Sequence, residues 1–355
     1  MNSDKLSTVR NIASENAMAV FDEAWSKSEQ LLSQARPIVE ESLSKASLDP
    51  SQICIATVGS TARHEALSAS DIDLLPIWCG DPKEFPRFED LTGKVREDLR
   101  QQTGLDVSTS RNLMRSTELA SLCRADGIGG DDDHRRTLTQ RMLVLTESEQ
   151  LGGSRSISEV RREILEAYVG EREDDRTVSK HPMAVCNDIA RYYRTLCVDY
   201  KSRAETKPES WAERHAKLRN PRKIWYFSTV MAISHRVAEM ENVTSTKLFD
   251  GLADIFGQSP ILRLASAAEA SNLPHVKDIY EIFSNYLSDM GSSDFRAGLS
   301  RVSFEDRKDP YLPGGASNPY FNMYQRSRDL SAKMILTLEE ASQAIQKKAL
   351  NWFLL

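Results

Sequence analysis

The sequence predicts an α+β protein: a small mixed-sheet domain flanked by N-terminal helices and followed by an all-α domain. Two apolar runs rich in β-forming residues, 53–58 and 74–78, predict the central strands. From residue 156 onward apolar residues recur at helical spacing and strand signals nearly vanish. The expected parts are N-terminal helices over 1–49, the sheet domain over 50–153 and the helical domain over 154–355.

Length and composition limit the classes of protein that fit. The 355 residues are enough for two or three domains with a substantial core. The net charge of -6 gives no global attraction to nucleic acid, so any site for a polyanion has to be local. The five scattered cysteines form no Cys-x-x-Cys pair, and no apolar run suits a signal peptide or a membrane span. We therefore expect a reduced cytoplasmic protein without membrane contact.

Helical spacing and turn residues predict the individual elements. Residues 5–47 are expected to form two helices, or one helix broken near Pro37. A short strand is expected over 105–108, after the Thr103-Gly104 turn. Further helices are expected over 87–102, 137–147, 156–170, 182 to about 203, and 221–238.

The stretch between the two central strands carries the main chemical signal. Ten residues separate the Gly59-Ser60 pair from Asp71-Ile72-Asp73. Because strand side chains alternate between faces, Asp71 and Asp73 should point one way and Ile72 the other, toward the core. Two carboxylates one pleat apart suit Mg²⁺, which takes waters and substrate phosphates as its remaining ligands. Gly59 permits close backbone approach, and a helix beginning after Ser60 would present N–H groups to a phosphate.

At these residues the stretch resembles the nucleotidyltransferase superfamily of DNA polymerase beta. Its variant in protein uridylyl- and adenylyltransferases, and in bacterial nucleotidyltransferases without assigned substrates, also has an Arg, a Glu and a Ser matched here by Arg63, Glu65 and Ser70. The resemblance covers about residues 50–205. It implies that Asp71 and Asp73 hold two Mg²⁺ ions, with Mn²⁺ as the alternative ion. The nucleotide-binding residues implied in this region are Gly59, Ser60, Arg63 and Ser70.

A third carboxylate is expected at Asp106. In the superfamily that this stretch resembles, another acidic residue lies on the strand beside the Asp-x-Asp strand, and Asp106 stands between apolar residues in the short strand predicted there. A further carboxylate would ligate the acceptor-side metal and accept the proton of the attacking hydroxyl. The alternative is an ordinary residue at the entry of a strand after a glycine turn.

A cationic row is expected on the helix that begins at Pro182. Arg191, Arg194 and Lys201 recur at helical spacing and would hold the triphosphate if the row faced the metal site. Alternatively, Arg191 and Arg194 pair with Asp188 and Asp199 in a surface network. The adjoining stretch 201–223 has eight Lys or Arg against three Glu and is the expected place for a polyanion contact.

These features predict a metal-dependent transferase that moves a nucleoside monophosphate from an NTP, with ATP favoured, to an acceptor hydroxyl and releases pyrophosphate. No motif in the sequence identifies the acceptor (protein, RNA or small molecule) or the oligomeric state. One alternative is a regulatory protein that senses NTP without turnover. Another is RNA cleavage by Arg176 and His181, although Pro182 disfavours a helix there. A third, metal binding by Asp131–Asp133, is disfavoured because consecutive residues cannot converge on one ion.

Overall fold

The computed structural model describes residues 5–68, 70–105, 107, 115–124, 128, 137–169, 182–206, 210–239 and 245–353. The predicted α+β class is confirmed, with a small mixed sheet and a mostly helical C-terminal region. The chain divides into a sheet unit (24–188 and 240–259) and a helical unit (1–23, 189–239 and 260–355). Both predicted domain limits, after residues 49 and 153, fall inside the sheet unit.

Four strands form one mixed sheet with the order β3-β2-β1-β4. Strand β1 pairs antiparallel with β2 and β4, whereas β2 and β3 run parallel. The strand β4 was not predicted, because its sequence, Ser-Glu-Gln-Leu-Gly, has little apolar content. It forms only by pairing with β1, which lies far away in the sequence. The strands span Ile53–Val58 (β1), Asp73–Trp78 (β2), Thr117–Glu118 (β3) and Ser148–Gly152 (β4).

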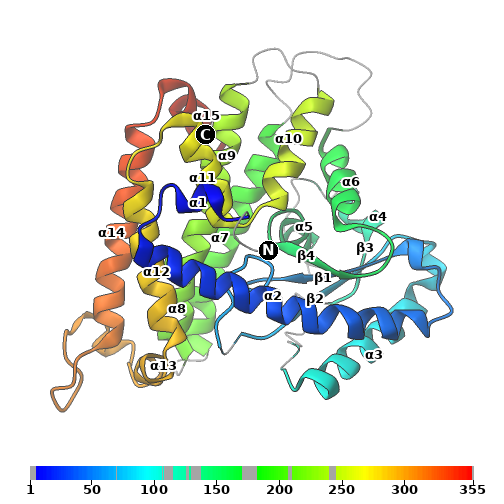
Figure 1. Ribbon diagram of the computed structural model, residues 1–355, viewed down its shortest axis with the longest axis horizontal. Coiled ribbons are helices and arrows are strands. Elements are labelled where there is room, and N and C mark those ends of the chain that lie inside the picture. The colour runs from blue at the N-terminus through cyan, green and yellow to red at the C-terminus, as the bar shows by residue number, and fades with distance from the viewer. Residues whose placement is uncertain are drawn as a thin grey trace. The chain divides into compact units, whose positions relative to one another are not determined.

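Helices α2 (Glu15–Ser44) and α3 (Phe85–Thr103) contribute side chains to one apolar cluster with the strands. Figure 1 shows α2 lying along the sheet. The predicted break at Pro37 is wrong, because α2 continues through it. An interior proline costs about 3 kcal/mol. Burial of Leu32 and Ala35 before it, and of Val39 after it, offsets that cost.

The opposite side of the sheet unit is built from helices α5 (Thr137–Thr146), α6 (Ile157–Val169) and α10 (Ser245–Gly257). Arg141 of α5 is fully buried; its Nε donates to the Leu122 carbonyl at 2.8 Å and its Nη1 lies 3.4 Å from Asp188 Oδ2. Tyr168 also donates to Asp188 Oδ2, at 2.8 Å. Asp188, in the first turns of α7 (Pro182–Thr206), is therefore a buried partner of Arg141 and Tyr168, and its pairing with Arg191 or Arg194 stays a prediction.

The helical unit contains the rest of α7 and a group of helices packed around α9 and α12. Helix α9 packs against α11 and α15, and α12 packs against α14. Among the described residues, no helix combines the length and the apolar character that a membrane crossing requires. The helices span Ser7–Arg10 (α1), Trp211–Arg219 (α8), Pro221–Ala238 (α9), Pro260–Ser271 (α11), Val276–Gly291 (α12), Ser293–Leu299 (α13), Pro319–Glu339 (α14) and Gln343–Phe353 (α15).

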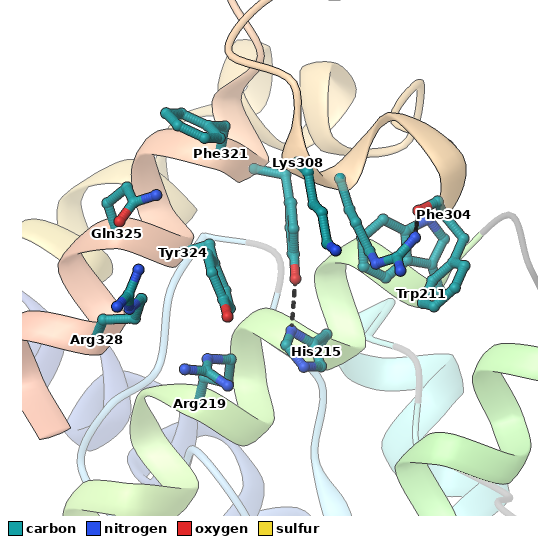
Figure 2. A pocket seen from close by; sticks show the side chains of 11 residues that line it. Trp211, His215, Arg219, Phe304, Lys308, Phe321, Tyr324, Gln325 and Arg328 are labelled. Carbon is teal, nitrogen blue, oxygen red and sulfur yellow. Dashed lines mark hydrogen bonds between the residues drawn. The ribbon is translucent and has the colours of Figure 1, made fainter.

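A polar contact joins α8 to α14 inside the helical unit. Tyr320 Oη and His215 Nδ1 lie 2.8 Å apart (Figure 2). Burial, and then the nearby Arg219 and Lys223, lower the pKa of His215 to about 4. Burial also raises the pKa of Tyr320 above its ordinary value. His215 is therefore neutral near pH 7, and the direction of its hydrogen bond with the phenol depends on which ring nitrogen carries the hydrogen.

This lowered pKa predicts acid sensitivity of the helical unit. The unfolded chain binds a proton at His215 near pH 6.5, whereas the folded chain does not until about pH 4, so stability present at neutral pH is lost on acidification. From about pH 7 to about pH 5 this residue should remove about 2 kcal/mol from the free energy of unfolding. Urea denaturation at both pH values should show a smaller loss for His215→Asn, whose amide can donate to or accept from the Tyr320 hydroxyl but does not titrate. An unchanged pH dependence in the variant would contradict the assignment.

Gly153 gives a second prediction. Its φ is +90°, and a Cβ there would lie 2.2 Å from the Ile53 carbonyl oxygen. Gly153→Ala should therefore lower the free energy of unfolding by about 3 kcal/mol, through backbone strain plus the clash. Gly104→Ala is the matched control: its φ is +66° with nothing within 4 Å, and it should cost about 1 kcal/mol. Urea denaturation measures both variants. Equal losses of unfolding free energy would contradict the prediction, because the clash at residue 153 would then add nothing to the backbone strain.

Candidate functional site

The two predicted carboxylates lie where β2 begins. Asp71 and Asp73 are half-buried, whereas Ile72 and Leu74 are buried in the cluster shared with α2 and α3. The predicted alternation of faces is therefore confirmed. Ile72 also forms a parallel bridge with Val107, so the predicted short strand touches the Asp-x-Asp segment at that residue.

Gly59 holds the backbone directly against one of these carboxylates. The antiparallel register ends with Val58 opposite Asp73, and Gly59 follows with φ +79°. A Cβ at Gly59 would lie 2.7 Å from Asp73 Oδ2, closer than side-chain contacts allow. The backbone angle favours glycine, and a larger residue here would also displace the Asp73 carboxylate.

Hydrogen bonds join the Gly-Ser turn to the segment before Asp71. Ser60 Oγ lies 3.5 Å from Ser70 Oγ, and Ser70 Oγ accepts from the Leu67 amide at 2.8 Å. Thr61 Oγ1 donates to the Asp71 carbonyl at 3.1 Å. The turn thus brings Gly59, Ser60, Ser70, Asp71 and Asp73 into one place.

The helix expected after Ser60 does not form. Residues 59–64 make hydrogen-bonded turns, in which the Arg63 amide donates to the Gly59 carbonyl at 3.0 Å and the Glu65 amide to the Ser60 carbonyl at 2.9 Å. His64 then adopts a φ of +56°, which ends the right-handed coil after a single turn. A helix N-terminus is therefore not the source of phosphate-binding N–H groups here.

Arg63, predicted to contact nucleotide, is placed in a buried ion-pair cluster. Its Nε lies 2.8 Å from Glu65 Oε2, and its Nη1 pairs with Glu147 at the end of α5. All three side chains are at most 5% exposed. The guanidinium thereby fixes the turn after β1 to the segment between α5 and β4. Direct contact of Arg63 with a nucleotide stays a prediction.

Helix α2 supports the same turn from within the sheet unit. The rings of Trp25 and His64 stack with centroids 3.8 Å apart and planes 9° apart. Ser28 Oγ accepts from the Ala66 amide at 3.1 Å and donates to the Ala24 carbonyl at 2.8 Å. Trp25 and Ser28 were missed as site residues, because an apolar and a small residue on a helix signal only packing.

The other predicted residues divide into two groups. Arg191, Arg194 and Lys201 lie on the part of α7 in the helical unit; Arg191 is half-buried and the other two are exposed. Whether this row faces the carboxylates stays a prediction. The residues that lie outside the described part of the chain are Asp106, Asp131–Asp133, Arg176 and His181.

Mg²⁺ is the metal that the described donors fit best. No group of three metal-ligating side chains occurs among the described residues. The pair Asp71 and Asp73 offers hard oxygen ligands at a half-buried edge, and Mg²⁺ is commonly held by one or two carboxylates together with waters and substrate phosphates. The pair therefore fits an ion that arrives with a nucleotide better than a closed, all-protein metal cage.

Comparison with known proteins identifies no relative: no family model, curated protein or solved structure matches the chain. The resemblance of residues 59–73 to the nucleotidyltransferase signature therefore depends on the motif and its geometry alone.

The buried cluster generates a stability prediction. Arg63→Met should lower the free energy of unfolding by about 3 to 5 kcal/mol, because two buried carboxylates lose their shared cation. Arg162→Met is the matched control in the same unit: Arg162 pairs with Asp250 where both side chains are about half exposed, and its loss should cost at most about 1 kcal/mol. Similar losses for both variants in urea denaturation would contradict the anchoring role of Arg63.

Proposed function

We propose that the protein is a Mg²⁺-dependent nucleotidyltransferase that transfers a nucleoside monophosphate from an NTP, with ATP favoured, to an acceptor hydroxyl and releases pyrophosphate. The observation that supports this most is the placement of Gly59 against Asp73. A glycine with positive φ is fixed beside a half-buried carboxylate, with Asp71 two residues earlier on the same face. A surface hairpin does not need this combination of backbone conformation, spacing and charge.

The polar groups around the turn suit a polyphosphate. Gly59 brings the turn against the Asp73 carboxylate, and the hydroxyls of Ser60 and Ser70 lie 3.5 Å apart just before Asp71. Asp71 and Asp73 would hold Mg²⁺, which would neutralise phosphate charge and align the attacking and leaving oxygens. The buried Arg63 cluster and the stacking of Trp25 on His64 would keep the turn rigid while substrate binds.

Two parts of the proposal come from the sequence alone. Asp106 would complete the carboxylate set and accept the hydroxyl proton. The row of Arg191, Arg194 and Lys201 would contact the triphosphate. The exposure of Arg194 and Lys201 leaves them accessible to such a ligand. Protein, RNA and small-molecule hydroxyls all remain candidate acceptors.

Replacing both carboxylates tests the proposal. Asp71→Asn with Asp73→Asn keeps side-chain size but removes two negative charges, so nucleotidyl transfer should fall by about 1,000-fold or more. The measurement is transfer of label from [α-³²P]ATP to components of a cell extract with Mg²⁺, followed by mass spectrometry of the labelled product. Removing Mg²⁺ with EDTA should abolish transfer by the wild-type protein.

The matched control is Glu89→Gln with Asp90→Asn, which removes two carboxylates from an exposed turn of α3 in the same unit and should leave transfer unchanged. Labelled product that persists in the Asp71/Asp73 variant would contradict the mechanism. Retention of intact ATP by the wild-type protein, with no transfer and no pyrophosphate, would identify the alternative function of NTP sensing.

A further inference from the structure

A cavity of about 410 Å³ lies within the helical unit. It is formed by one side of α8, the 3₁₀ turn Glu305–Lys308 with the residue before it, and the first turns of α14 (Figure 2). Helix α8 lies about a hundred residues before the other two segments in sequence, and the cavity arises only where they meet. Its volume lies in the range of small-ligand pockets, about 300 to 1,000 Å³.

The charged side chains that line this cavity in the described part of the chain are all positive. Four cations line it: Arg219 from α8, Arg307 and Lys308 from the 3₁₀ turn, and Arg328 from α14. Of the described residues that line it, none is a carboxylate. In a chain with a net charge of -6, such a local excess of positive charge favours an anionic ligand.

Aromatic rings lie between these cations. Arg219 stacks over the Tyr324 ring at 4.6 Å, and Arg307 over the Phe304 ring at 3.8 Å. Trp211 meets Tyr320 edge to face at 4.5 Å. The Arg219 Nε donates to Ser327 Oγ at 2.8 Å, which fixes its guanidinium over the ring. Rings and guanidinium planes in such alternation are the surfaces on which nucleobases stack.

The concentration of positive charge affects the neighbouring titratable groups. Burial, and then Arg219, lower the pKa of Lys223 to about 8. His215 is held neutral and shares a hydrogen bond with the Tyr320 hydroxyl through its Nδ1. A bound phosphate would reduce the mutual repulsion of these cations.

We propose that this cavity binds one unpaired nucleotide, with its base on the aromatic and guanidinium faces and its phosphate at Lys308, Arg328 and Arg219. Two sources share this chemistry: a free nucleoside monophosphate, and the terminal nucleotide of a single-stranded RNA. An inorganic anion would use the cations but not the rings. The site lies wholly in the helical unit, so the proposal does not depend on nucleotidyl transfer at Asp71 and Asp73.

The test measures binding by isothermal titration calorimetry on the full chain carrying Asp71→Asn and Asp73→Asn, in EDTA. The probes are AMP, a 5′-phosphorylated five-nucleotide oligoadenylate and inorganic pyrophosphate. AMP or the oligonucleotide should bind, and whichever binds more tightly identifies the source. Lys308→Gln with Arg328→Gln should weaken that binding about tenfold or more; both side chains are exposed, so the fold should persist.

Two further variants separate the contribution of base stacking from that of the cavity's positive charge. Tyr324→Leu should weaken AMP binding about tenfold while leaving pyrophosphate binding unchanged, because only a base uses the ring. The matched charge control is Lys217→Gln with Lys333→Gln. It removes one cation from α8 and one from α14, neither of which lines the cavity, and should leave binding unchanged. The proposal is overturned if neither nucleotide probe binds, if the control weakens binding as much as the Lys308/Arg328 variant, or if pyrophosphate binds as tightly as AMP and Tyr324→Leu has no effect.

Discussion

The antiparallel pairing of β1 with β2 is the constraint on which the candidate site depends. Its register runs from Ile53 opposite Trp78 to Val58 opposite Asp73, and the next residue, Gly59, meets the Asp73 carboxylate. A shift of one residue would turn Asp71 and Asp73 into the core and expose Ile72. Burial of Ile53, Ile55, Leu74 and other apolar residues against α2 and α3 resists that shift, so the energy that fixes the sheet also positions the carboxylates.

Buried cations hold the other parts of the sheet unit in place. Arg63 joins the turn after β1 to Glu147, Arg141 joins α5 to Asp188, and Arg161 of α6 donates to the Val144 carbonyl and to Ser148. The Arg63 and Arg141 contacts join residues 84 and 47 positions apart in sequence, and the Arg161 contacts join α6 to the nearby end of α5 and the start of β4. Because a buried ion is costly unless it is fully bonded, such clusters restrict the chain to one arrangement. A rigid turn beside a pair of carboxylates is what in-line transfer at phosphorus requires.

The two proposed sites use opposite charges for related ligands. At Asp71 and Asp73 the protein supplies negative charge, which suits a phosphate only when a metal ion accompanies it. In the helical unit Arg219, Arg307, Lys308 and Arg328 supply positive charge directly, beside aromatic rings. The first arrangement suits chemistry at a polyphosphate, and the second suits retention of a nucleotide.

The amino-acid sequence by itself determined the α+β class, most helices and the Gly59 to Asp73 signature, because strand alternation and helical spacing are local properties. It did not determine β4, the unbroken helix at Pro37 or the support of His64 by Trp25, since each depends on partners distant in the chain. The excess of basic residues in 201–223 can be read from the sequence. That Arg219 lies beside Lys308 and Arg328 cannot. Only tertiary structure decided that grouping, because packing of α8 against α14 creates the cavity.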